Sequence, residues 1–299
     1  MKTELYEVAG HRLSVTGDES IFTLMKNYEP FAVPDDGKTP LVRLTADDSN
    51  RDSNRESDAE NGATFPEGFT EEMHQDDEGT EIIFGHVGGQ PVFVFRWNGV
   101  TAGWVVCSED FCEGRLHLTG RMRKSAIDNS MMVLYALATA DKGTALFHAA
   151  VVSHGGRGFM FLGKSGTGKS THARLWLKHI GDTELVNDDN PVVRDGVVYG
   201  SPWSGKTPCY RNVSFPVGGI VLLSQAPYNR IEPLKSIAAY AALVSSISGM
   251  RWNRHIADGL HDTENTLVST VPIWHLECLP DGEAAILCQT TIDNYAERH

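Results

Sequence analysis

The segment GKSGTGKS, residues Gly163–Ser170, constrains the fold more than any other part of the chain. It fits the pattern G-x-x-x-x-G-K-[S/T], follows directly on the apolar run FMFL and opens the helix-like run STHARLWLKHI. A glycine-rich loop between a strand and a helix lets successive backbone amides turn around a phosphate, and the helix N-terminus adds partial positive charge. The segment therefore predicts a phosphate-binding loop inside an α/β fold.

Each position of this loop has an expected part in holding a nucleoside triphosphate. Lys169 is expected to reach the β and γ phosphates, and the Ser170 hydroxyl is expected to be a ligand of Mg²⁺, so ATP and Mg²⁺ are the predicted cofactors. The alternative is a glycine-rich turn that binds nothing, which the agreement between motif and flanking elements disfavours. The expected nucleotide-binding residues are Gly163, Ser165, Gly166, Thr167, Gly168, Lys169, Ser170 and Thr171.

Two neighbouring carboxylates, Asp188 and Asp189, come at the end of the next apolar run, LVNDD. Neighbouring residues of a strand point to opposite faces, so the two side chains should play different parts. One carboxylate can hold Mg²⁺, and the other can accept a proton from a hydroxyl that attacks the γ phosphorus. The alternative is a polar turn in which Asp and Asn make local hydrogen bonds.

The hydrophobic pattern divides the chain near Arg123. The runs EIIFGHV, PVFVFRW, TAGWVVCS and RLHLTG predict a β-meander in a smaller β-rich domain over residues 1–123. Residues 46–79 are so polar that they predict a disordered surface insertion within that domain. From Lys124 a helix ending near Gly143 is predicted, and then strands over TALFHAAVVSH, GFMFLG and ELVN alternate with a helix after the loop. This order predicts an α/β domain over residues 124–299.

The net charge and the composition limit the classes of partner that we expect the protein to bind. The formal net charge is −13, and Asp47–Glu78 holds 12 acidic residues against two arginines. Without a run of Lys or Arg, neither nucleic acid nor an anionic membrane is expected as a partner. Five scattered cysteines without a C-x-x-C pair indicate reduced thiols, and Met1–Leu13 lacks the pattern of a secretory leader. Ser236–Met250 is too short to span a bilayer and predicts a buried helix. We expect a cytoplasmic protein.

The run HAAVVSHGGRGFMFLGKSGTGKS followed by LVNDD resembles the catalytic domain of the HPr kinase/phosphorylase family, in which a His, a Gly-containing hairpin, the phosphate loop and a strand ending in Ala-Asp-Asp follow one another. The segments SGTGKST and GIVLLSQAP are also similar to ATP-dependent phosphoenolpyruvate carboxykinase. The resemblance covers residues 148–227. It implies a P-loop-containing mixed sheet with helices of the HPr kinase-like and phosphoenolpyruvate carboxykinase-like type.

Carried over residue by residue, the resemblance implies that Asp188 is the base for the acceptor hydroxyl and that Asp189 is the carboxylate on the metal side. It implies that His148 lies beside the transferred phosphate. The chain departs from the family at Thr171, where the family carries Glu, and FPVGGIVLL lacks the family's later Arg followed by Gly-x-Gly. We therefore do not carry over HPr as the acceptor or the reverse phosphorolysis.

A further cation is expected from the segment GSPWSGK, which ends at Lys206 and is followed by Arg211. A cation on a Gly/Ser loop can neutralise the charge that spreads over the transferred phosphoryl group or grip an acidic acceptor, and Lys206 is the better candidate. The alternative is an ordinary turn with solvated cations.

These features predict a kinase that moves the γ-phosphoryl group of ATP to a hydroxyl, most simply Ser or Thr of a small protein or peptide. Two alternatives stay open: a nucleotide-gated module that binds a protein or peptide with little turnover, and a kinase for a small metabolite. The sequence names no acceptor, gives no signal for ATP over GTP, and leaves open whether the chain forms a homo-oligomer.

Overall fold

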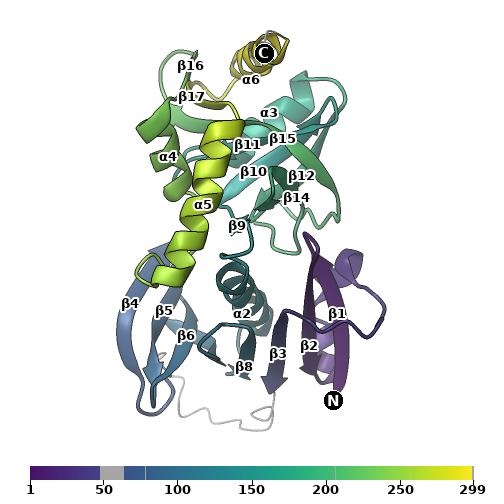
Figure 1. Cartoon of the computed structure of the whole chain (residues 1–299), viewed down its shortest axis with the longest axis vertical. Helices are drawn as coiled ribbons and strands as arrows, with labels where there is room; N and C mark the ends of the chain where they lie inside the picture. The colour runs from purple at the N-terminus through teal and green to yellow at the C-terminus, as the bar shows by residue number, and fades with distance from the viewer. Residues whose placement is uncertain (48–63, 78, 206, 298–299) are drawn as a thin grey trace. The chain divides into compact units, whose positions relative to one another are not determined.

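The computed structural model describes residues 1–47, 64–77, 79–205 and 207–297. The chain divides into two compact units, Met1–Ala138 and Thr139–His299 (Figure 1). Each unit is built on its own sheet, and both sheets contain parallel and antiparallel strand pairs. The protein is therefore a mixed α/β protein, as the sequence predicts.

The first unit is an eight-stranded sheet in the order β1-β2-β3-β8-β7-β6-β5-β4. The predicted meander is confirmed, because β5 to β8 pair antiparallel in chain order. The short helices α1 (Glu19–Phe22) and η1 (Lys26–Phe31) follow the second strand. The strands are β1 (Lys2–Val8), β2 (His11–Gly17), β3 (Val42–Asp47), β4 (Thr70–Asp77), β5 (Thr80–Val87), β6 (Gln90–Trp97), β7 (Val100–Cys107) and β8 (Glu113–Leu118).

The helix predicted from Lys124 is α2 (Arg123–Ala138), and it packs on β3, β7 and β8 of the first sheet. Its buried residues include Ile127, Met131 and Leu134. The division between the units therefore falls after this helix, whereas the sequence places it at Arg123. The hydrophobic pattern detects where a helix begins but not which of two sheets its apolar side covers.

The disorder predicted for residues 46–79 does not hold at its ends. β3 runs to Asp47, and Thr70–Asp77 form β4, which pairs antiparallel with β5. The side chains of β4 are almost all exposed, so the strand lacks the alternating pattern by which a strand is recognised in a sequence. Its backbone hydrogen bonds to β5 hold it in place instead. Residues 48–63 and 78 lie outside the described part of the chain.

The second unit is a nine-stranded sheet whose main path is β12-β10-β11-β15-β14-β13-β9, with β17 beside β15 and β16 beside β17. Strands β11, β15 and β17 are parallel to one another, and β10 is antiparallel to both of its neighbours. The strands are β9 (Thr144–Leu146), β10 (Ala149–His154), β11 (Arg157–Leu162), β12 (Thr183–Asp189), β13 (Val192–Arg194), β14 (Val197–Tyr199), β15 (Ser214–Gln225), β16 (Arg230–Pro233) and β17 (Ile273–Cys278).

The single strand predicted over TALFHAAVVSH is in fact two strands, β9 and β10, which pair with different neighbours. The break falls at Phe147 and His148. Phe147 forms a bridge with Ile247, and the amide of His148 donates to the carbonyl oxygen of Ser246 at 2.7 Å. Both contacts are made by residues about 100 positions later in the chain, so the local sequence pattern does not predict the break.

Helices α3 (Lys169–His179) and α6 (Gly282–Ala296) pack together against the central strands (Figure 1). Their shared core joins Phe159 and Phe161 of β11 to Trp176 of α3 and Ile292 of α6. The buried helix predicted over Ser236–Met250 is the shorter α4 (Ser236–Val244), which packs on α5 (Arg254–Thr270). It is not a buried helix: it buries only Ala239, Ala242 and Leu243, and Ile237 is exposed, because only one face of α4 is covered. No helix among the described residues is long and apolar enough to cross a membrane.

Candidate functional site

Most of the predicted site residues lie together at one edge of the second sheet. β12 is antiparallel to β10, as β11 is, so β11 and β12 run in the same direction. Their carboxyl ends therefore meet at one edge, where β11 leads into the phosphate loop and β12 ends in Asp188 and Asp189. His148 precedes the first residue of β10 and so starts from the same edge. In open α/β sheets, ligands bind beyond the carboxyl ends of the strands.

The loop has the backbone geometry that the motif requires. Gly163, Gly166 and Gly168 have φ angles of +145°, +79° and +106°, in the region that favours glycine. A Cβ atom at Gly163 would lie 2.5 Å from Thr167 Oγ1, which is inside contact distance. Thr167 closes the turn, since its amide and its hydroxyl both donate to the carbonyl oxygen of Lys164, at 3.1 and 2.7 Å. The chain thus forms a narrow loop rather than an open turn.

The ammonium group of Lys169 lies inside this loop. Its Nζ atom donates to the carbonyl oxygens of Gly163 at 2.8 Å and Lys164 at 3.4 Å, and the side chain is buried. Its neighbour Lys164 is exposed to solvent. A buried cation held by two carbonyl oxygens can turn to a phosphate that enters the loop without leaving its place in the fold.

Helix α3 directs its N-terminus into the loop. Its N-cap is Gly168, which has no side chain to accept hydrogen bonds from the first-turn amides, and the first turn contains no acidic residue. Ser170 and Thr171 are half-buried in this turn. From the end of β15, the Gln225 side chain donates to the carbonyl oxygen of Gly166 at 3.2 Å and so fixes the tip of the loop. These uncapped amides and the helix dipole suit an anion.

The two carboxylates differ in exposure and in the face of the sheet that they occupy. Asp188 lies opposite Ala150 of β10, and Ala150 lies opposite Phe161 of β11. The Phe161 ring contacts the His172 ring of α3, with centroids 4.7 Å apart, so this row of residues lies on the face that α3 covers. Asp188 is 4% exposed, and its Oδ1 atom has no hydrogen-bond partner among the described residues.

Asp189 is half-exposed and is oriented by two side chains. His148 Nδ1 lies 3.3 Å from its Oδ1 atom, and Asn190 Nδ2 donates to its Oδ2 atom at 2.9 Å. An imidazole beside a carboxylate can share a proton with it. The structure therefore brings together His148, both aspartates and the strand that leads into the loop.

Asn187 is a residue of this edge that the sequence analysis missed. The sequence gives it no role beyond the alternative of a polar turn, in which Asn makes local hydrogen bonds. Its side chain is fully buried and accepts from the amides of Asp189 and Asn190, at 3.0 and 2.9 Å. Its position in a strand, where Asn is infrequent, is the one signal in the sequence that could have drawn attention to it.

Neither of the two predicted cations is found beside the aspartates in the described part of the chain. Lys206 lies outside the described residues. Arg211 donates to the carbonyl oxygen of Leu185 at 2.7 Å and to the Glu184 carboxylate at 2.6 Å, so it lies along β12 away from the aspartates. Two residues of the same segment, Ser204 and Gly205, do lie at the site. Ser204 forms an isolated antiparallel β-bridge with Asp189, and the amide of Gly205 donates to the carbonyl oxygen of Asp188 at 2.9 Å.

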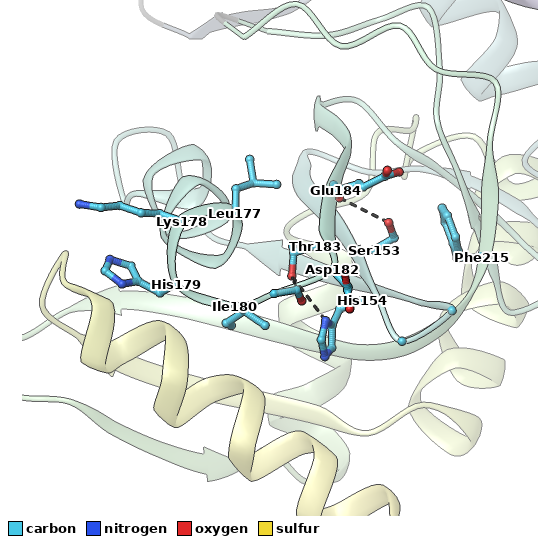
Figure 2. Close-up of a pocket in the computed structure, with 13 residues that line it drawn as sticks. Ser153, His154, Leu177, Lys178, His179, Ile180, Asp182, Thr183, Glu184 and Phe215 are labelled. Atoms are coloured by element: carbon cyan, nitrogen blue, oxygen red, sulfur yellow. Dashed lines mark hydrogen bonds between the residues drawn. The ribbon is translucent and has the colours of Figure 1, made fainter.

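A large hollow of the second unit, about 580 Å³, lies at the opposite end of the strands. It is lined by the end of β10, the end of α3 and the start of β12 (Figure 2). Figure 2 shows Lys178 and His179 directed to one side, whereas Glu184 and Ser153 lie on the other, so its polar groups do not converge on one point. A binding site needs a few convergent polar groups, and we therefore place the candidate site at the phosphate loop.

The residues at the loop fit a nucleotide with its metal ion. The narrow glycine loop, the buried Lys169 and the unpartnered oxygen of Asp188 are the parts that a magnesium-bound triphosphate requires. In the described part of the chain, no three His, Cys, Asp or Glu side chains are grouped as a metal site.

Comparison with known proteins assigns no relative: no protein-family model matches the chain, and a search of curated proteins finds no match.

Proposed function

We propose that the protein is an ATP- and Mg²⁺-dependent kinase that transfers a γ-phosphoryl group to a hydroxyl, on an HPr kinase-like, phosphoenolpyruvate carboxykinase-like nucleotide domain. The observation that carries the proposal is the meeting of the phosphate loop with an acid pair at the ends of two strands that share β10 as a neighbour. A half-exposed carboxylate beside a histidine is an arrangement that can accept a proton, which supports transfer rather than binding alone. We also propose that the protein is located in the cytoplasm, because such a kinase needs ATP.

In the proposed reaction the loop amides and Lys169 hold the β and γ phosphates. Mg²⁺ neutralises charge on the phosphate oxygens when it is bound, with Ser170 and one aspartate as its protein ligands. The other aspartate accepts the proton of the acceptor hydroxyl as its oxygen bonds to the γ phosphorus. The bond from the γ phosphorus to the bridging oxygen breaks, and ADP leaves with that electron pair.

The geometry favours Asp188 as the metal-side carboxylate and Asp189 as the base, the reverse of the order that the family resemblance implies. Asp188 lies on the face covered by α3, the helix whose first turn carries Ser170. Asp189 is half-exposed and lies beside His148, which can take up the proton that the carboxylate accepts. An acceptor must reach the base from solvent, and only Asp189 is open to it.

We propose Ser or Thr of a small protein or peptide as the acceptor, because the loop and Asp189 lie on an exposed edge rather than in an enclosed pocket. The two alternatives are a nucleotide-gated binding module and a kinase for a small metabolite. Incubation with γ-labelled ATP and cell extract distinguishes them: a labelled polypeptide supports the proposal, label in the low-molecular-weight fraction supports the metabolite kinase, and binding without transfer supports the module. Failure to bind any purine triphosphate with magnesium would overturn all three.

A further inference from the structure

The end of β12 is tied to the segment 201–205 by a closed group of buried polar side chains. Asn187 and Ser201, both fully buried, are its centre. The Asn187 Nδ2 atom donates to Ser201 Oγ at 3.1 Å and to the carbonyl oxygen of Trp203 at 3.2 Å. Ser201 Oγ donates to the carbonyl oxygen of Asn190 at 2.6 Å and accepts from the amide of Trp203 at 3.1 Å. We call these contacts the Asn187–Ser201 clamp.

The clamp acts on the backbone that carries both aspartates. The Asn187 Oδ1 atom accepts from the amides of Asp189 and Asn190, so one amide side chain fixes the chain on either side of Asp189. Every polar atom of the Asn187 side chain is thus used. A fully satisfied buried network permits few alternative arrangements of its members.

The clamp also brings the segment 201–205 against the acid pair. Gly205 donates its amide to Asp188, and a Cβ atom at Gly205 would lie 2.9 Å from the Asp188 carbonyl oxygen and 3.1 Å from Asp189 Cβ. Only a residue without a side chain allows this approach. The segment 201–205 therefore packs directly against the backbone that carries the two carboxylates.

We infer that Asn187 is a positioning residue: through its clamp with Ser201 it fixes the directions of the Asp188 and Asp189 carboxylates, which the proposed transfer requires. The role rests on the proposed function, because it is defined by what the two acids do. A carboxylate misplaced by about 1 Å can lower a rate by roughly a hundredfold.

Two variants test the inference, Asn187→Ala and Ser201→Ala, with Thr263→Ala as the matched control. Thr263 is also a buried polar residue of this unit, and its hydroxyl donates only within α5, to Gly259. Three quantities are measured on the full chain: hydrogen exchange of the Asp189 and Asn190 amides, affinity for ATP without metal, and the rate of γ-phosphate release or transfer.

In Asn187→Ala the exchange of both amides should rise by about tenfold or more, since they lose their shared acceptor. Affinity for metal-free ATP should stay within about twofold, because Lys169 and the loop amides do not touch the clamp. The rate at saturating ATP should fall by roughly a hundredfold. Ser201→Ala should show the same pattern to a smaller degree, and Thr263→Ala should leave the exchange and the rate unchanged.

The outcomes separate the clamp from the function. Unchanged exchange in Asn187→Ala would overturn the clamp, whatever the protein catalyses. Faster exchange with an unchanged rate would overturn the positioning role, and so would an equal loss in Thr263→Ala. A wild-type chain that binds no nucleotide would overturn the proposed function and with it the positioning role, whereas the exchange measurement would still decide whether the clamp exists.

Discussion

His148, which directly precedes β10, and Asp189, the last residue of β12, meet at the sheet edge with His148 Nδ1 3.3 Å from Asp189 Oδ1. Each backbone is held independently: the amide of His148 donates to Ser246, and that of Asp189 donates to Asn187. The fold therefore places the two backbones side by side, and the contact between the two side chains orients the Asp189 carboxylate. This arrangement suits a carboxylate that must accept a proton at a defined place.

The two aspartates should respond differently to neutralisation. Asp189→Asn should lower the transfer rate by about 10²- to 10⁴-fold, the usual contribution of a general base, and leave magnesium-dependent binding of ATP nearly intact. Asp188→Asn should instead weaken the dependence of ATP binding on magnesium. Titration calorimetry with and without Mg²⁺, together with the transfer assay, measures both effects. If Asp188→Asn kept its magnesium response and lost only turnover, the order implied by the family resemblance would be correct.

Lys169→Ala should remove nucleotide-dependent activity. The variant loses the buried ammonium group that lies against the loop carbonyls, and the expected loss of transfer is about 10²-fold or more. Lys164→Ala, which removes an exposed cation one residue into the same loop, is the control and should retain most of the activity. Equal losses in both variants would show that general positive charge is what matters, and would contradict the role given to Lys169.

Gly163→Ala should damage the loop more than Gly181→Ala damages the end of α3. A methyl group at Gly163 would lie 2.5 Å from Thr167 Oγ1 at a φ of +145°, whereas a methyl group at Gly181 would meet nothing within 4 Å. Strain of this kind costs about 1–3 kcal/mol, so Gly163→Ala should lower the free energy of unfolding by that amount and weaken ATP binding. Urea denaturation and nucleotide titration of both variants provide the comparison.

Stability should fall as the pH drops through the range in which a free histidine titrates. Burial lowers the pKa of His172 from 6.5 to about 4, and its Nε2 atom accepts from the Trp176 indole at 3.1 Å. Between these pH values the unfolded chain takes up a proton that the folded chain does not, so stability is full above about pH 6.5 and is lost toward pH 4. The loss attributable to His172 is at most about 3 kcal/mol.

His172→Gln, which keeps an acceptor for Trp176, should flatten this dependence. His179→Gln, on the same helix but exposed, should not. Urea denaturation at several pH values between 4 and 7.5 measures the slopes. Parallel curves for the wild type and His172→Gln would show that other groups cause the acid sensitivity.

Local patterns were sufficient for the parts of the fold in which neighbours in sequence are neighbours in space. The loop between β11 and α3 and the meander from β5 to β8 are of this kind. The patterns failed where a distant segment decides the structure. Ser246 separates β9 from β10, pairing with β5 orders the polar strand β4, and packing on the first sheet assigns α2 to the first unit.

At the candidate site, residue types predicted which groups gather, because a phosphate loop and an acid pair each have a recognisable sequence. They could not predict which acid faces α3, since that depends on the register between β12 and β10. They also could not reveal Asn187 as more than a turn residue, because its partners Ser201 and Trp203 lie beyond two short strands.

The lack of a hydrogen-bond partner for Asp188 Oδ1 among the described residues has a consequence for how the protein could evolve. Asp188 Oδ1 is a buried acceptor with no donor among the described residues, an arrangement that costs about 1–3 kcal/mol where no ligand supplies the donor, so an apolar substitution of Asp188 should make the ligand-free chain more resistant to heat. Selection of variants for heat resistance alone would then favour replacement of this acid among the first changes. A variant selected in that way would keep the fold but lose the proposed activity, because thermal stability favours an apolar side chain at residue 188 whereas the proposed activity requires the carboxylate.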